Sequence, residues 1–262
     1  MITPLARAGK AILLEKPIAR TGAEAETVVE ICETAGVPLG IVFQHRMRAA
    51  SIKAANLTAS GQLGALGLAD ITVPWWRDQS YYDAPGRGTY ARDGGGVLIS
   101  QAIHTIDLAL SLTGPVASVQ AMTATTRFHR MEAEDFASAG LRFENGAVGT
   151  LTASTASFPG GAETITLHFD KASLHLGEGV LTLTWRDGRV ETFGAVAGTG
   201  GGADPMAFTH DWHQGILEDF TAALRDRRAP CVTGRQGLDS HRLIDAITLS
   251  AHEGRTVTLK DI

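Results

Sequence analysis

The chain has 262 residues, of which 44% are hydrophobic and 19% are charged, and its formal net charge is -5. This size and composition are typical of a globular protein with one large domain or two smaller ones. The acidic balance excludes the basic surface on which proteins that bind nucleic acids or acidic membranes depend, so we expect neither partner. We expect a cytoplasmic protein, because the sequence shows no signal-peptide pattern and no apolar run long enough for a membrane span.

The two cysteines, Cys32 and Cys231, stand far apart in the sequence. Their spacing matches no metal-binding or redox motif. We therefore expect two free thiols in a reducing compartment and no disulfide.

The first 46 residues predict part of a parallel sheet. Residues 11–14 and 37–43 are short apolar runs, and between them Thr21 and Glu24 begin a helical pattern that ends near Gly36. Strand, helix and strand in succession predict a parallel βαβ unit covered on both faces. Stable open sheets usually have about four or more strands. We therefore expect residues 1–46 to be a partial Rossmann-like domain whose N-terminal strands are absent.

Polar residues follow both predicted strands of this unit. Lys16 comes after the first strand, and His45 and Arg46 come after the second. In parallel α/β sheets, ligands bind beyond the carboxyl ends of the strands, so these side chains are candidates for cofactor binding. No Gly-x-Gly-x-x-Gly turn, which would cradle a pyrophosphate, occurs in this region. The glycine-rich stretch 198–202 instead has the composition of a flexible linker.

Residues 93–110 join three consecutive glycines to an apolar run with helical spacing. The glycines predict a tight turn that another segment approaches closely. On the helix that follows, Ser100, His104 and Asp107 share one flank, because residues three and four apart are neighbours on a helix. A polar flank on an apolar helix indicates a chemical role, although a lone histidine there is more often structural.

The remaining residues, 47–262, predict a larger α+β unit. A helix at 47–61 and a strand at 66–73 precede a polar and aromatic loop at 78–92. Alternating patterns, with hairpin turns at 145–146 and 187–188, predict strands at 116–124, 135–143, 147–154, 163–169, 172–176, 180–185 and 189–193. We expect helices 93–111 and 210–227 on one face of this sheet, and a last helix able to pack back on residues 1–46.

The predicted fold class is therefore α/β plus α+β. The C-terminal remnant of a Rossmann-like parallel sheet is followed by a larger domain with an open, mainly antiparallel sheet.

The loop at 78–92 supplies candidates for substrate binding. Tyr82 offers an aromatic face to the C–H surface of a sugar, and Arg87 offers donors to a hydroxyl or carboxylate. Packing or subunit contact is the alternative role for these aromatic residues. Trp76 and Arg77, just before the loop, are further candidates for cofactor binding.

A second polar group, formed by His129, Glu132, Glu134 and Asp135, has a composition that could bind a metal. Its spacing fits no compact ligand set. We therefore expect a solvated loop and no bound metal.

Several features in order along the chain resemble the Gfo/Idh/MocA oxidoreductases, the family of glucose-fructose oxidoreductase and inositol dehydrogenase. The resemblance extends over essentially the whole sequence. The features are Glu15-Lys16-Pro17 ending one strand, Phe43-Gln44-His45-Arg46 ending the next, the glycine-led helix with His104 and Asp107, and the C-terminal pattern of Trp212, Ile216, Asp219, Phe220 and Gly254-Arg255-Thr256-Val257.

This resemblance implies hydride transfer between NAD or NADP and a secondary alcohol of a sugar, polyol or sugar derivative. It implies Lys16 and His104 as an acid/base pair, with Glu15 and Pro17 beside the cofactor. Many members carry aspartate at the position of Ser100. A serine can only exchange a neutral hydrogen bond, so Ser100 and its neighbour Gln101 are candidates for substrate contact alone.

The resemblance also implies that one face of the antiparallel sheet pairs subunits, so we expect a homodimer or homotetramer. At strand spacing, we expect that face to carry Val148, Leu151, Ile165 and Leu167.

Two other functions stay open. The chain could be a non-catalytic truncated relative that acts as an oligomeric sugar-binding or regulatory protein, since the missing glycine-rich turn puts NAD binding in doubt. It could also be a glycoside hydrolase that retains the cofactor and oxidises its substrate transiently.

Overall fold

A computed structural model describes residues 1–196 and 209–262 of the chain. The predicted linker at 198–202 lies outside these residues.

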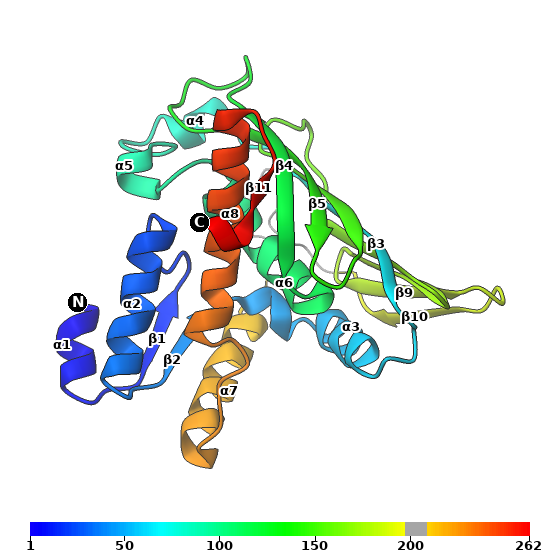
Figure 1. Ribbon diagram of the computed structural model, residues 1–262, viewed down its shortest axis with the longest axis horizontal. Coiled ribbons are helices and arrows are strands. Elements are labelled where there is room, and N and C mark those ends of the chain that lie inside the picture. Colours follow the sequence, from blue (N-terminus) through cyan, green and yellow to red (C-terminus); the bar gives the residue numbers. More distant parts are fainter. Residues whose placement is uncertain (197–208) are drawn as a thin grey trace.

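The N-terminal part forms the small parallel sheet (Figure 1). Strand β1 (Ile12–Glu15) pairs with β2 (Leu39–Val42), and helix α2 (Gly22–Thr34) connects them. The Thr21 side chain caps α2 by accepting a hydrogen bond of 3.2 Å from the backbone N–H of Glu24. Helix α1 (Ile2–Arg7) packs against α2. The predicted strand, helix and strand are confirmed.

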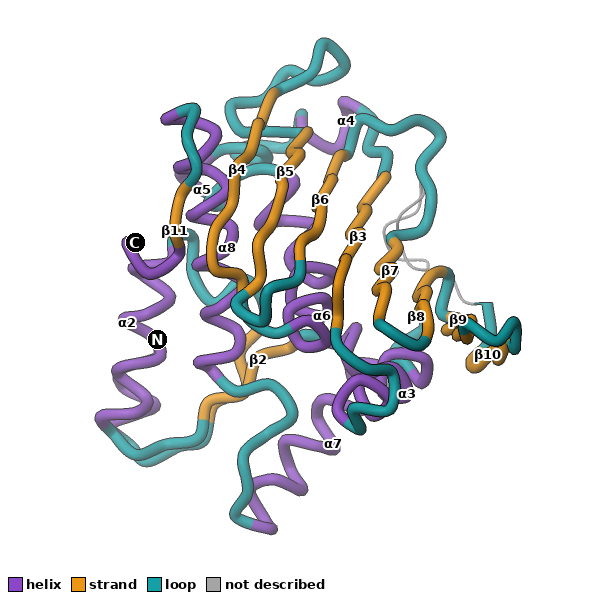
Figure 2. The backbone as a smooth tube through the Cα atoms, turned by 45° about the vertical axis from the view of Figure 1, so that its right-hand side comes forward, coloured by secondary structure: helices purple, strands orange, loops and turns teal. Residues whose placement is uncertain are grey.

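The large sheet is mixed but mainly antiparallel. Within the described ranges its strand order is β10-β9-β8-β7-β3-β6-β5-β4-β11, and only the β3 and β6 pairing is parallel (Figure 2). The predicted open sheet is confirmed, with boundaries that move by at most one residue, and a short edge strand at residues 257–258 was not predicted. The strands are β3 (Leu66–Pro74), β4 (Val116–Ala124), β5 (Phe136–Phe143), β6 (Val148–Ser154), β7 (Thr164–Phe169), β8 (Ala172–Gly177), β9 (Val180–Trp185), β10 (Val190–Gly194) and β11 (Val257–Thr258).

Three helices cover one face of this sheet: α3 (Ala49–Ala59), α6 (Ile103–Thr113) and α8 (Gly234–Glu253) (Figure 2). Helix α7 (Asp211–Asp226) does not join them, so its predicted place on the sheet is wrong. It packs instead against the 3-10 turn η1 (Gln44–Met47) and β2. Gly40 in β2 explains this placement, because it has no side chain and leaves room for the ring of Phe220 on α7. A Cβ at position 40 would lie 2.7 Å from that ring.

Helix α8 stands between the small sheet and the large one (Figure 1). It contacts α2 and β2 on one side and β4 and α6 on the other. The buried His241 on α8 accepts a hydrogen bond of 3.2 Å from the backbone N–H of Ile18, and Asp245 accepts one of 3.1 Å from that of Gly22. These bonds fix the segment that follows β1 against the larger part of the protein.

The outer face of the large sheet differs from the predicted one. Leu151, Ile165 and Leu167 are at most 1% exposed and face the helices, so placing them on the outer face was wrong. Side chains alternate along a strand, and Val148, which is 43% exposed, has the opposite parity to Leu151 in β6. The outer face therefore presents mostly small polar residues, with scattered apolar side chains such as Met122.

The predicted solvated loop around residue 129 was also wrong for most of its members. His129, Glu134 and Asp135 are buried, and only Glu132 is exposed. The His129 ring bridges Asp135 Oδ2 at 2.7 Å and the backbone oxygen of Arg77 at 2.8 Å. Both ring nitrogens therefore have protein partners in place of water, which allows the ring to be buried. In the part of the chain that the structure describes, no group of His, Cys, Asp or Glu is arranged to hold a metal.

The helical stretch 90–113 is long and apolar enough to cross a membrane by length and composition, contrary to the expectation from the sequence. However, 83% of its most apolar window is buried inside the protein. It is therefore a core helix, as its place beneath the large sheet requires.

The outer sheet face makes the predicted oligomer testable. We expect sedimentation velocity at micromolar concentration to show a dimer or tetramer. A charge placed at an exposed apolar site of this face, Val148→Asp, is expected to shift the protein toward monomer, because an unpaired buried charge is costly at an interface. A wild-type protein that sediments only as a monomer would rule out this arrangement.

Candidate active site

The end of β1 meets the glycine-led helix. Lys16 follows β1, and its Nζ donates a hydrogen bond of 3.0 Å to the backbone oxygen of Ser100. Ser100 lies one turn before His104, in a π-helical turn, η2 (Leu98–Ala102), that leads directly into α6. Single π-helical turns of this kind are frequent at functional sites. The structure therefore brings together Lys16, Ser100 and the helix that carries His104.

The start of this helix is held by Glu134. Its carboxylate accepts hydrogen bonds of 3.1 Å from the backbone N–H groups of Gly96 and Leu98, and its own backbone oxygen accepts one of 2.8 Å from Val97. Burial raises the pKa of Glu134, and the two backbone donors oppose that effect. Helix starts carry unsatisfied N–H groups, and this carboxylate satisfies two of them.

His104 is a neutral imidazole in this environment. Its ring stacks on that of His45, with centroids 4.8 Å apart, and meets the ring of Phe43 edge-on at 5.9 Å. Burial lowers the pKa of His104 well below its usual value of 6.5, and the charge of Lys16 lowers it further. Burial and the charge of Arg48 act on the pKa of His45 in the same direction.

Lys16 titrates closer to neutral pH than a surface lysine does. Burial lowers its pKa to about 8; the carboxylate of Glu15 opposes the shift and the charge of Arg87 reinforces it. An amine with this pKa is available in both its protonated and neutral forms near cellular pH.

Arg46 is engaged by the protein itself. Its Nε and Nη2 donate hydrogen bonds of 2.7 Å to the two carboxylate oxygens of Asp107, whose side chain is fully buried. Its Nη1 also reaches the backbone oxygen of Cys231 at 3.4 Å. This predicted cofactor-binding residue thus ties the end of β2 to α6.

Part of the loop at 78–92 reaches the site. The guanidinium of Arg87 lies over the ring of Tyr81, 4.9 Å from its centroid, and the Tyr81 hydroxyl accepts a hydrogen bond of 3.3 Å from Gln101 Nε2. Gln101 follows Ser100 directly, so this hydrogen bond brings the loop to the turn that accepts the Lys16 hydrogen bond. Arg77 stacks on the rings of Trp75 and Tyr81 at its edge.

Two other predicted residues lie elsewhere. Tyr82 is buried in the core, where its hydroxyl shares a hydrogen bond of 2.6 Å with Thr155 Oγ1. Trp76 packs against the rings of Phe128 and Phe158. Alternation along the chain after β3 explains this placement, because Trp75 and Arg77 point to the opposite side from Trp76.

Several buried polar atoms of the site have no hydrogen-bond partner among the described residues. They are Gln44 Oε1, Gln101 Oε1, His45 Nδ1 and His104 Nδ1. Leaving a buried polar group unsatisfied costs roughly 1–3 kcal/mol. A bound polar ligand or an ordered water would satisfy atoms of this kind.

Known proteins resemble this chain in sequence and in fold. Residues 52–175 match the GFO/IDH/MocA C-terminal domain. The chain is 30% identical to D-apiose dehydrogenase from Paraburkholderia graminis, over 98% of this chain and 68% of that one. It is 27% identical to 1,5-anhydro-D-fructose reductase from Ensifer adhaerens, over 97% and 74%. The crystal structure of the WlbA dehydrogenase from Bordetella pertussis, in complex with NADH and UDP-GlcNAcA, superposes with a TM-score of 0.80 at 31% identity, over 98% and 74%.

The chain belongs to the Gfo/Idh/MocA family. It is an oxidoreductase, as its named relatives are. This confirms the resemblance in sequence.

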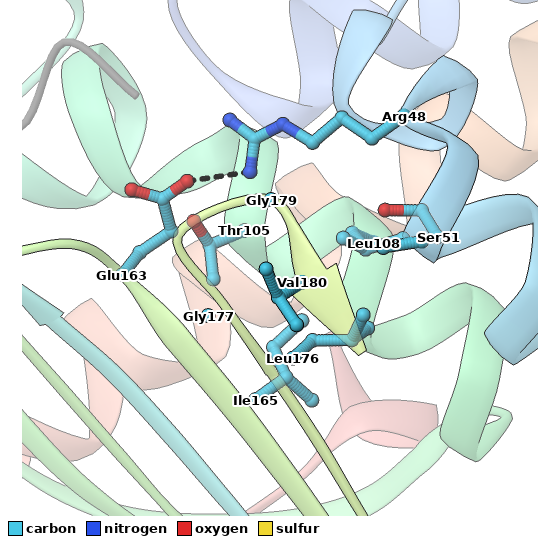
Figure 3. Close-up of a pocket in the computed structure, with 11 residues that line it drawn as sticks. Arg48, Ser51, Thr105, Leu108, Glu163, Ile165, Leu176, Gly177, Gly179 and Val180 are labelled. Atoms are coloured by element: carbon cyan, nitrogen blue, oxygen red, sulfur yellow. Dashed lines mark hydrogen bonds and ion pairs between the residues drawn. The ribbon is translucent and has the colours of Figure 1, made fainter. Parts of the chain in front are cut away.

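The candidate site also contains residues that the sequence did not reveal. Arg48 donates to Glu163 Oε1 at 2.6 Å, shares a contact of 2.7 Å with His45 Nε2, and lies over the Trp212 ring at 4.5 Å. Figure 3 shows the Arg48 and Glu163 pair in the lining of a small pocket, with Thr105 and Ser51 also in its wall. The basic run from His45 to Arg48 was a signal for Arg48, whereas Glu163 is 115 positions from Arg48 and had none.

Gly96 tests the close contact at the helix start. A Cβ on Gly96 would lie 1.7 Å from the backbone oxygen of Glu134, an impossible contact. We expect Gly96→Ala to destabilise the protein by more than about 3 kcal/mol in chemical denaturation, because the backbone of one segment must move. Gly67→Ala, whose Cβ would meet its nearest atom at 3.7 Å, is the matched control. Equal midpoints for the two variants would contradict this account.

Loss of the Arg46 and Asp107 pair is expected to lower the free energy of unfolding far more than loss of a surface ion pair does. Asp107→Asn leaves the Arg46 charge without its buried partner, which costs about 3–5 kcal/mol in the free energy of unfolding. The double variant Arg46→Met/Asp107→Leu is expected to recover most of this loss. Asp187→Asn breaks an exposed pair with Arg189 and is expected to leave the midpoint unchanged. Equal effects of Asp107→Asn and Asp187→Asn would count against the buried pair.

Proposed function

We propose that this chain is an NAD- or NADP-dependent oxidoreductase that acts on a secondary alcohol of a sugar or sugar derivative. The observation that carries the proposal is the 3.0 Å hydrogen bond from Lys16 Nζ to Ser100, on the helix that bears His104. The names of the relatives support it, since D-apiose and 1,5-anhydro-D-fructose are sugars or sugar derivatives. The NADH in the WlbA complex supports a nicotinamide cofactor.

The residues present fit the nicotinamide end of such a cofactor. Glu15, Lys16 and Pro17 lie beyond the carboxyl end of β1, where ligands of α/β sheets bind. The unsatisfied amide oxygens of Gln44 and Gln101 are acceptors for a carboxamide. The nicotinamide, when bound, accepts or supplies the hydride. We assign no residue to the pyrophosphate, since residues 1–46 contain no Gly-x-Gly-x-x-Gly turn.

The two proposed acid/base residues differ in their chemistry. Lys16 is suited to carry the proton, because a pKa of about 8 populates both of its forms near cellular pH. In oxidation the neutral amine of Lys16 takes the hydroxyl proton of the substrate, and in reduction the ammonium returns it. His104 resists protonation, so it acts as a neutral hydrogen-bonding group that orients the same hydroxyl. Ser100, Gln101 and Arg87 are proposed to contact other oxygens of the substrate.

The first test is turnover. We expect the protein to change the absorbance of the nicotinamide at 340 nm with at least one of D-apiose, 1,5-anhydro-D-fructose and UDP-GlcNAcA. Lys16→Met is expected to lower kcat by about 10²- to 10⁴-fold, the usual contribution of a general acid or base. Lys260→Met, at an exposed site, is the control. Sugar binding by calorimetry without NADH binding or turnover would support the non-catalytic alternative instead.

The pH dependence of kcat/KM gives a second test, because it is expected to have opposite slopes for oxidation and for reduction of the substrate. Oxidation needs neutral Lys16, so its kcat/KM is expected to rise with pH and level off above about 8. Reduction needs the ammonium form, so its kcat/KM is expected to fall through the same pH. No inflection is expected near 6.5, because the pKa of His104 lies well below that value. An inflection near 6.5 that disappears in His104→Gln would transfer the proton-carrying role to His104.

A further inference from the structure

His104 is oriented in an unusual way. A histidine at a reaction centre normally has its far nitrogen fixed by a hydrogen bond to a carboxylate or carbonyl. In the described residues, His104 Nδ1 is buried and has no such partner. The ring is held instead between Phe43, edge-on at 5.9 Å, and His45, stacked at 4.8 Å with the planes 25° apart. The orientation of His104 therefore depends on the ring of His45.

His45, in contrast, has a hydrogen bond that fixes its tautomer. Its Nε2 lies 2.7 Å from Nη2 of Arg48. A guanidinium has donors and no acceptor, so Nε2 must accept, and the ring proton of neutral His45 resides on Nδ1. Protonation at Nε2 would set two donors against each other. Arg48 thus determines both the tautomer and the plane of the His45 ring.

Arg48 is itself held on several sides. Its Nη1 donates to Glu163 Oε1 at 2.6 Å, as Figure 3 shows, and its guanidinium stacks on Trp212. The other carboxylate oxygen of Glu163 accepts a hydrogen bond of 3.3 Å from Trp75 Nε1. The Arg48 and Glu163 side chains are only 8% and 4% exposed. A planar, forked donor held in this way has one orientation, so Arg48 is a rigid support.

We propose that His45 is a positioning residue for the reaction, held by Arg48 and Glu163 as the neutral tautomer with its proton on Nδ1, and that it fixes the ring plane of His104 by stacking. This rests on the role of His104 in the proposed function. The titratable and charged groups that face the His45 imidazole are Lys16, Arg48, Glu163, His104 and His213.

The tautomer can be measured without any substrate. In protein labelled with ¹⁵N-histidine, long-range ¹H–¹⁵N correlation spectra are expected to show His45, assigned with His45→Phe, as the Nδ1–H tautomer throughout pH 6–8. In Arg48→Lys a compact ammonium on a flexible stem replaces the rigid fork that now reaches both Glu163 and His45, so a mixture of tautomers is expected. Arg142→Lys, on the exposed side of β5, should leave the pattern unchanged. An Nε2–H tautomer or an imidazolium at pH 7 in the wild type would overturn the proposal.

The stacking role is tested with two substitutions of His45. His45→Phe keeps a flat ring against His104, and His45→Ala removes it. With the best sugar of the panel above, we expect His45→Ala to lower kcat by about 100-fold, the effect of misplacing a reacting group by about 1 Å, while KM changes less than about threefold. His45→Phe should retain about tenfold more kcat than His45→Ala. Equal losses in the two variants, or a change in KM alone, would reject the stacking role.

Failure of this proposal can be distinguished from failure of the proposed function. If no sugar is turned over, the proposed function fails. The NMR chemical shifts of the His104 ring protons then test the stacking role without any substrate. They are expected to move in His45→Ala and to stay closer to wild type in His45→Phe. Unchanged shifts in His45→Ala would contradict the stacking even in an inactive protein.

Discussion

The site depends on the buried ion pair between Arg46 and Asp107. Arg46 belongs to the turn after β2, and Asp107 belongs to α6, so the two hydrogen bonds of 2.7 Å join the small sheet to the large one. The Asp107 side chain has no exposed surface, and an unpaired charge there would be strongly unfavourable. The bidentate geometry fixes orientation as well as distance. The contacts from Lys16 to Ser100 and from His45 to His104 both cross this junction.

Around this junction the protein separates two kinds of charged group. Glu134 and Glu163 are immobilised by backbone N–H groups, by Arg48 and by Trp75. Lys16 and His104, in contrast, lie where burial and neighbouring cations make their neutral forms easier to populate. Fixed carboxylates support the structure, while the groups proposed to contact substrate keep unsatisfied hydrogen-bonding capacity. This division suits the proposed substrate, because sugar hydroxyls are neutral groups that both donate and accept hydrogen bonds.

Three segments meet the proposed catalytic helix at different levels. Glu134 holds its start, the loop residue Tyr81 contacts Gln101 in the π-helical turn, and His45 packs on His104 one turn later. The glycines allow the first contact, because any Cβ at Gly96 would overlap the backbone beside Glu134. The position of His104 is therefore determined by contacts along the whole first half of the helix.

The sequence alone determined every described strand except the two-residue β11, together with the helix after the three glycines and the family, because alternation, turn residues and short motifs are local patterns. It could not assign the sheet faces or the burial of His129, since a polar residue is solvated or buried according to which distant partner it finds. Only the tertiary structure placed α7 on β2, engaged Arg46 with Asp107 and brought Glu163 to Arg48. Those contacts join segments far apart in the chain, and their energies come from burial and pairing that no local pattern records.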